Sequence, residues 1–157
     1  MTEAPKGRRI ATLRLVREGG FAAPDDYPGR EVQVTNASAI YRFMSPYAER
    51  EVVEAFWILA LDAQMRITKG APIVITRGIL NSALVHPREV FRAALHANAM
   101  SIVAVHNHPS GDPTPSQDDR LITQQLAAAG ETMGIALLDH IIIGAGRYAS
   151  FRESGIF

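Results

Sequence analysis

The stretch from residue 101 to 120, SIVAVHNHPSGDPTPSQDDR, constrains the fold more than any other part of this chain. The apolar residues 102–105 predict a buried strand, and His106 and His108 follow it directly. Because side chains at positions i and i+2 of a strand point to the same face, the two imidazoles can converge just beyond the strand. A loop rich in Pro and Gly then leads to a helix that is predicted to begin at Ser116.

This arrangement predicts a metal site. Neutral imidazole is a common metal ligand. Ser116 is a preferred N-cap residue, and Asp119 stands three residues later, in the first turn of the helix. Two histidines and a carboxylate with an open position form a catalytic zinc arrangement, so His106, His108 and Asp119 are the predicted zinc ligands. A plainer interpretation remains open, in which the histidines end a strand and Ser116 and Asp119 form a capping box.

The spacing His-x-His-Pro followed by Ser-x-x-Asp resembles the signature of the JAB/MPN zinc metallopeptidases, the JAMM motif. The longer string HNHPSGDPxPSxxD resembles the RadC-like branch of that family, as do residues 85–91 and 138–144. The likeness covers about residues 31 to 157. It implies a single JAB/MPN-like α/β domain, with a mixed sheet flanked by helices in a cytidine-deaminase-like three-layer arrangement. It also implies zinc as the cofactor and hydrolysis of a peptide or isopeptide-linked protein.

Amide hydrolysis needs a group that takes a proton from water and passes it to the leaving nitrogen. Zinc lowers the pKa of its bound water to about 7. Glu54 stands two residues before the apolar run 56–61, and the resemblance places the catalytic glutamate ahead of such a strand. Glu51 is the competing residue, and a glutamate at a strand end is most often simply solvated. The resemblance gives Ser116 a second role, holding the oxyanion by a hydrogen bond.

The other histidines and nearby acids carry weaker signals. Asp139 and His140 lie in an apolar run, where they are expected to be satisfied core residues or to support the metal ligands from behind. His86 precedes Pro87 and is expected to mark a helix entry. His96 is expected on a helix surface. Asp112 lies in the Pro/Gly loop and is expected to make a turn contact.

Hydrophobic periodicity predicts the rest of an α/β domain. Pro46 is expected to help end the first helix. Pro72 argues that its strand lies at a sheet edge or carries a bulge, and that strand should form a hairpin with residues 56–61. The predicted strands are 31–34, 56–61, 67–76, 102–105, 135–143 and 148–151, and the predicted helices are 36–44, 88–98 and one that begins at 116.

Length and composition narrow the class of protein. The 157 residues suggest one domain at 31–157, preceded by an N-terminal extension at 1–30. Lys and Arg total 16 and so do Asp and Glu, so nucleic-acid binding is expected to be weak or absent. The absence of Cys excludes disulfides and thiolate metal sites and fits the cytoplasm. The sequence shows no secretory signal and no apolar run long enough to span a membrane, so no membrane association is expected.

Other metal enzymes fit poorly. The chain has no HExxH motif, which a zincin requires, and it lacks the two Cys of zinc deaminases. Barrel phosphoesterases need about 250 residues. Two alternatives to a peptidase stay open: a DNA-associated role, which the RadC name suggests, and a catalytically silent scaffold of the MPN type.

Overall fold

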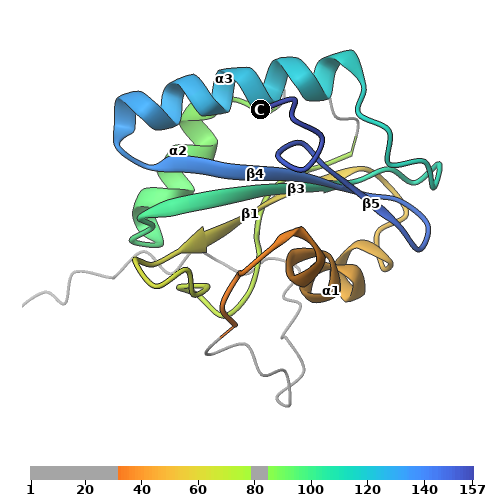
Figure 1. Ribbon diagram of the computed structural model, residues 1–157, viewed down its shortest axis with the longest axis horizontal. Coiled ribbons are helices and arrows are strands. Elements are labelled where there is room, and N and C mark those ends of the chain that lie inside the picture. The colour runs from red at the N-terminus through yellow and green to blue at the C-terminus, as the bar shows by residue number, and fades with distance from the viewer. Residues whose placement is uncertain (1–31, 79–84) are drawn as a thin grey trace, which may run out of the picture.

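A mixed sheet of five strands with helices on both faces forms the described part of the chain (Figure 1). The structure is a computed structural model that describes residues 32–78 and 85–157. Its strands are β1 (Ala55–Leu61), β2 (Ile73–Arg77), β3 (Ser101–Asn107), β4 (Ala136–Ile143) and β5 (Tyr148–Ser150). Its helices are α1 (Ala37–Ala48), α2 (Pro87–His96) and α3 (Gln117–Met133). This architecture confirms the predicted α/β fold.

The strand order β2-β1-β3-β4-β5 places β3, the strand that leads to the histidines, at the centre of the sheet. β3 pairs antiparallel with β1 and parallel with β4, and the other neighbouring pairs are antiparallel. The parallel pair needs a crossover, which α3 supplies. Figure 1 shows α3 along one side of the sheet and α1 on the other. The loop before α3 therefore returns to the end of β3, where the metal-site residues are predicted.

Alternating side chains of the central strands build two apolar cores, one on each face of the sheet. On one face, Trp57, Val103 and Val105 pack with Phe43 and Met44 of α1. The core between the sheet and helices α2 and α3 contains Phe56, Ile58, Val90, Ile102, Ala104, Ile122 and Leu126. His106 follows Ala104 by two residues in β3, so its ring lies on the α3 face of the sheet.

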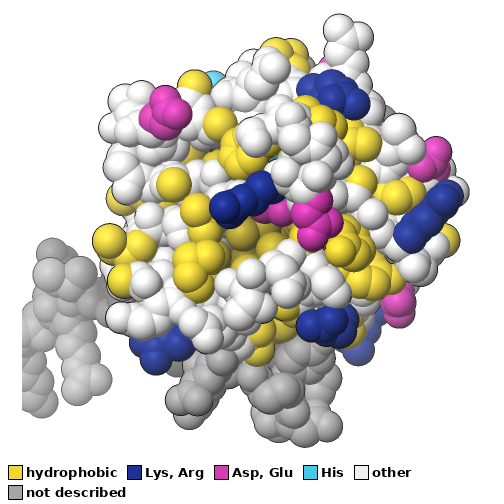
Figure 2. All heavy atoms as spheres, in the orientation of Figure 1, with side chains coloured by type: hydrophobic (Ala, Val, Ile, Leu, Met, Phe, Trp, Pro, Cys, Tyr) yellow, Lys and Arg dark blue, Asp and Glu magenta, His cyan; other side chains and the backbone are white. Residues whose placement is uncertain are grey.

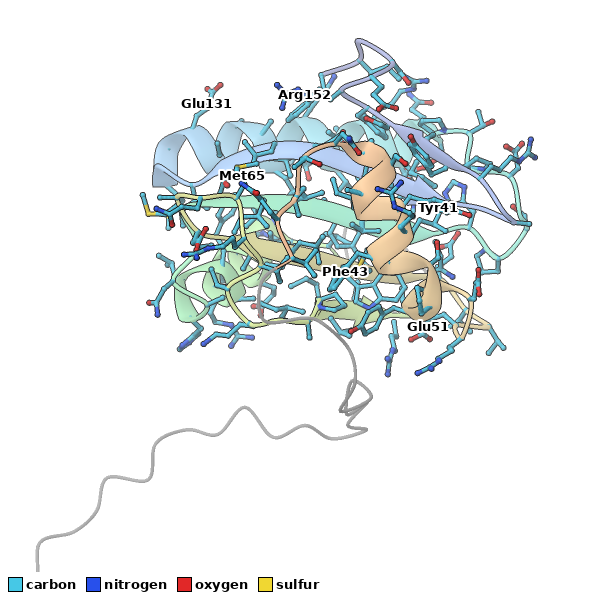
Figure 3. The ribbon with its side chains drawn as sticks, turned by 60° about the horizontal axis from the view of Figure 1, so that its bottom comes forward. Tyr41, Phe43, Glu51, Met65, Glu131 and Arg152 are labelled. Carbon is cyan, nitrogen blue, oxygen red and sulfur yellow. The ribbon has the colours of Figure 1, made fainter. Side chains whose placement is uncertain are left out.

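Helix α1 lies across the sheet face that is turned forward in Figure 3, where Tyr41 and Phe43 are labelled on it. Asn36 caps the helix, because its Oδ1 accepts a hydrogen bond from Ala39 N at 2.8 Å. The prediction that Pro46 ends the helix is wrong, since α1 continues to Ala48. Met44 and Ala48 are buried on either side of this proline, and their packing outweighs the backbone hydrogen bond that it removes.

The β1–β2 hairpin is confirmed, but β2 is shorter than predicted. It begins at Ile73, directly after Pro72, and occupies an edge of the sheet. Ile67 forms only an isolated bridge with Leu61. Gly70, which lies between Ile67 and the start of β2, has φ +65°, a left-handed conformation that interrupts the pleat. The proline therefore sits at the strand entrance, where its missing N–H breaks no ladder bond.

Helix α2 begins and ends much as predicted. His86 caps it, with Nδ1 accepting a hydrogen bond from Arg88 N at 3.0 Å, and His96 is exposed. Two leucines of the helices are not buried, since Leu95 of α2 is 54% exposed and Leu121 of α3 is 42% exposed. Neighbouring apolar residues already fill the width of each helix stripe, so these two leucines face solvent.

The first predicted strand is reduced to one bridge, between Gln33 and Arg66. The proposed extension, residues 1–30, and Glu31 lie outside the described residues. Across residues 32–78 and 85–157, the helices are too short or too polar to cross a membrane.

Candidate metal centre

Three polar side chains converge where β3 ends and α3 begins. His106 is the sixth residue of β3, His108 follows the strand end, and Asp119 lies in the first turn of α3. The Nε2 atoms of the two histidines are 3.0 Å apart. Asp119 Oδ1 lies 3.0 Å from His106 Nε2, and Asp119 Oδ2 lies 3.3 Å from His108 Nε2. One ligand atom from each residue can therefore reach a common metal ion.

His108 is oriented by the loop that follows it. Its Nδ1 lies 2.7 Å from the backbone carbonyl oxygen of Asp112, which can only accept a hydrogen bond, so Nδ1 carries the proton. In the neutral ring, Nε2 then presents a bare lone pair toward His106 and Asp119. Several acceptor atoms thus face one another at hydrogen-bond distance, and a cation between them resolves the conflict. These residues therefore fit a bound metal ion.

The charge balance of the cluster is visible in its pKa values. Burial alone would raise the pKa of Asp119, but the close approach of His106 and His108 outweighs burial and holds that pKa far below its usual range. The hydrogen bond with Asp119 raises the pKa of His108 against the effect of burial, and the negative charge of Glu54 adds to this rise. In the metal-free protein, the carboxylate therefore favours the protonated form of His108.

The first turn of α3 aims Asp119 at the histidines. Ser116 Oγ accepts a hydrogen bond from Asp119 N at 3.1 Å, and Ser116 N donates to Asp119 Oδ2 at 2.7 Å. This capping box, which the sequence predicted, satisfies helix N–H groups and fixes the carboxylate in one orientation. The capping and metal interpretations therefore describe the same geometry rather than competing ones.

The Pro/Gly loop is held in shape from both sides. Asp112 Oδ1 accepts hydrogen bonds from Thr114 N at 3.0 Å and Thr114 Oγ1 at 2.7 Å, which is the predicted turn contact. The loop backbone is tied to the end of β4, because His108 N donates to Ile143 O at 2.8 Å. His108 therefore occupies a fixed position although it lies outside a strand.

Glu54 is placed beside this site by the asparagine between the two histidines. Asn107 is buried, its Oδ1 accepts a hydrogen bond from Ala55 N at 2.7 Å, and its Nδ2 donates to Val53 O at 3.0 Å. These bonds hold the residues on both sides of Glu54. Sequence reasoning missed this role, because a polar residue at a strand end gives no sign of a partner more than fifty positions away.

Glu51, the competitor of Glu54, has a different environment. Its Oε1 lies 2.8 Å from Arg77 Nη2 in an ion pair at the end of β2. Glu54 is half-buried, and its charge acts on His108. Of the two glutamates, Glu54 is therefore the one whose charge reaches the candidate metal ligands.

A family model described as a RadC-like JAB domain matches residues 34–156, nearly all of the described chain. The chain belongs to the RadC-like JAB family.

Curated relatives of this RadC-like chain agree with the family match. The UPF0758 protein of Pelobacter propionicus is 52% identical over 157 residues, covering 98% of this chain and 67% of that protein. The UPF0758 protein of Thermotoga maritima is 48% identical over 149 residues, covering 94% and 65%. That of Methanosarcina mazei is 43% identical over 123 residues, covering 78% and 53%. The chain thus spans half to two thirds of the length of these relatives, and their shared name states no activity.

His140 and Asp139, neighbours in β4 of this RadC-like domain, have different hydrogen-bond partners. His140 is fully buried, and its Nε2 lies 2.8 Å from His106 Nδ1, so it stands directly behind a candidate ligand. Burial lowers the pKa of His140 well below its usual value, and the nearby His106 adds to this effect. Asp139 instead accepts hydrogen bonds from Ser150 Oγ at 2.6 Å and from Arg152 N at 3.0 Å, which anchors the C-terminal segment.

The RadC-like domain also has a cavity of about 280 Å³ on the α1 face of the sheet. Val103, Leu138 and Asn36 are among the residues that line it, together with Met65 and Arg152, which are labelled in Figure 3. None of the three candidate metal ligands borders it. The chemistry of the donor atoms, rather than the size of this hollow, identifies the candidate site.

Proposed function

We propose that this RadC-like domain is a zinc-dependent hydrolase that cleaves peptide or isopeptide bonds. The observation that supports this most directly is the convergence of His106, His108 and Asp119, in which the histidine Nδ1 atoms make other hydrogen bonds and the Nε2 atoms face inward. Zinc bound there supplies Lewis-acid activation of water and of the substrate carbonyl. The family match supports the metal-dependent chemistry.

Two side chains of this chain complete the proposed reaction. Glu54 takes the proton of the attacking water and passes it to the leaving nitrogen of the amide. Ser116 steadies the oxyanion. Its hydroxyl accepts a hydrogen bond from Asp119 N, so its own proton is directed elsewhere and can be donated to substrate. The half-buried position of Glu54, next to a loop held by Asn107, supports a defined orientation for the carboxylate.

The alternative of a DNA-associated protein has less support. The chain carries no net charge. On the face shown in Figure 2, Lys and Arg side chains are scattered among apolar and acidic ones rather than gathered into a patch. A phosphate-binding surface requires such a patch.

A pair of glutamine variants tests the proposed reaction. Glu54→Gln keeps the size of the side chain but cannot carry the proton, so cleavage of peptide or isopeptide substrates by the zinc-loaded protein should fall about 10²–10⁴-fold. Zinc content and thermal stability should stay unchanged. Glu51→Gln is the matched control, because it removes a carboxylate three residues away that is paired with Arg77, and it should retain activity. Full activity of Glu54→Gln, or loss only in Glu51→Gln, would reject the assignment.

A further inference from the structure

We propose that Thr123 and His140 form a chain of ordered hydrogen bonds that fixes the metal-binding tautomer of His106. Both are positioning residues, since neither belongs to the three-ligand cluster. A neutral histidine can carry its proton on either ring nitrogen, and only the form with the proton on Nδ1 leaves Nε2 free to bind metal. The inference rests on the proposed metal site and deepens it, because it says what prepares one ligand before the metal arrives.

The chain starts at a group whose role is fixed by chemistry. Thr123 Oγ1 lies 2.6 Å from the backbone carbonyl oxygen of Asp119, and a carbonyl oxygen can only accept. Thr123 must therefore donate its single hydroxyl proton to that oxygen. Toward every other neighbour, the Thr123 oxygen can then act only as an acceptor.

The next neighbour is His140. Its Nδ1 lies 2.6 Å from Thr123 Oγ1, so Nδ1 must carry the proton that Thr123 accepts. The ring has no exposed surface, and it stacks on Phe151 with ring centroids 4.9 Å apart while Phe56 packs against it edge-on. An imidazole so enclosed by apolar rings stays neutral. With its one proton on Nδ1, His140 presents a lone pair at Nε2.

That lone pair faces the candidate ligand. His140 Nε2 lies 2.8 Å from His106 Nδ1, so His106 must donate from Nδ1. Its own Nε2 is then bare and lies 3.0 Å from Asp119 Oδ1 and from His108 Nε2. Each proton position along the chain follows from the one before, and the carbonyl of Asp119 fixes them all.

The chain returns to the residue from which it starts. Asp119 provides the backbone oxygen that orders Thr123 and the carboxylate that faces His106. This closed series of hydrogen bonds therefore joins α3, β4 and β3 through Asp119, His140 and His106. A metal ion entering this site meets a ligand whose tautomer and ring orientation are already set, which is how outer hydrogen-bond partners strengthen metal binding.

The first arm of the test removes the hydroxyl and keeps the shape. Thr123→Val replaces the hydroxyl with a methyl group, which frees His140 to take either tautomer, whereas Thr123→Ser keeps the hydroxyl. Zinc affinity is measured by competition with a chromophoric chelator. Thr123→Val should bind zinc about 10–100-fold more weakly than the wild type, and Thr123→Ser should match the wild type. Equal affinity in Thr123→Val and the wild type would overturn the proposal.

The second arm reads the protons without any metal. Long-range ¹H–¹⁵N correlation spectra of the metal-free wild-type protein, at a pH where the imidazoles are neutral, report which nitrogen of each histidine is protonated. Both His106 and His140 should carry the proton on Nδ1, and Thr123→Val should shift His106 toward a mixture. A proton on Nε2 of His140 or His106 in the wild type would refute the proposed order of hydrogen bonds. This arm remains decisive if Thr123→Val fails to fold.

The two arms separate failure of the metal site from failure of the chain. If the wild type does not bind zinc but shows the predicted tautomers, the proposed function is rejected and the order of hydrogen bonds still stands. If the wild type binds zinc but His106 or His140 carries its proton on Nε2, only the proposed order of hydrogen bonds is rejected.

Discussion

At the scale of single residues, His108 and Asp119 link the candidate site to pH. The pKa of His108 is raised above its ordinary value of 6.5. A raised pKa contributes stability that is complete below pH 6.5 and is lost as the pH rises through the pKa of the folded state. The lowered pKa of Asp119 acts oppositely, contributing stability that is lost only as the pH falls below its ordinary value of 3.8. The pair thus stabilises the metal-free protein most between these values.

Compared with His108→Ala, the metal-free wild type should therefore lose thermal stability as the pH rises above 6.5, while the lowered pKa of His140 acts equally in both proteins. Thermal unfolding followed by circular dichroism measures this slope. His108→Ala should lack this loss, because the proton-binding group is gone. Zinc should reverse the slope, since it binds neutral imidazole and competes with the proton. A wild-type slope identical to that of His108→Ala would show that the pair does not hold the proton.

Residues that act through local spacing could be predicted, and those that act through distant pairing could not. The candidate site residues of one continuous strand–loop–helix segment are His106, His108, Ser116 and Asp119. Their convergence follows from the two-residue period of a strand and from the geometry of a helix cap. His140 reaches His106 across 34 positions, through the pairing of β3 with β4. Nothing in the sequence near His140 specifies that register, so only the general possibility of a supporting role could be foreseen.

At the scale of elements, the loop that carries His108 depends on a close approach by Gly144. A Cβ added at Gly144 would lie 2.4 Å from Gly111 O and 2.8 Å from Pro113 Cδ, which is closer than any relaxed contact. The loop is bonded to the same place, because Ala145 N donates to Gly111 O at 3.0 Å. A side chain at residue 144 must therefore push the loop away from β4.

Gly144→Ala should destabilise the protein by about 1–3 kcal/mol, the usual cost of overpacking, and should weaken zinc binding because His108 moves with the loop. Gly146→Asn is a matched control two residues away. Gly146 has φ +66° and open space around the site of a Cβ, and Asn tolerates that conformation. Chemical denaturation and chelator competition measure both effects. Wild-type stability and zinc affinity in Gly144→Ala would show that the loop is not held there.

The element boundaries show where local signals fail. β1 and β3 were predicted within two residues because their apolar runs are buried on both faces. Pro46 predicts a helix end, but packing of Met44 and Ala48 carries α1 past it. β2 starts six residues later than predicted, because the segment that includes Gly70 turns before the strand begins. Burial against the sheet, which the local sequence does not state, decides the case of Pro46, and the left-handed conformation of Gly70 decides the case of β2.

At the scale of the whole molecule, the balanced charge limits the partners of this RadC-like domain. With 16 basic and 16 acidic residues, we expect at most weak, sequence-independent binding to DNA. Any such binding should fade steeply between about 50 and 200 mM salt as counterions compete. Fluorescence polarisation of a labelled duplex at both salt concentrations measures it. Tight binding that survives at the higher concentration would reject this expectation and favour the DNA-associated alternative.

The central claim is that His106, His108 and Asp119 form one zinc site, and metal analysis of the purified full chain tests it most directly. After loading with zinc and removal of the excess, the wild type should retain one zinc per chain by mass-spectrometric elemental analysis. His108→Ala should retain far less. His96→Ala is the control, since it removes an exposed histidine of α2 and should leave the zinc content unchanged. Equal zinc in the wild type and His108→Ala would contradict the account.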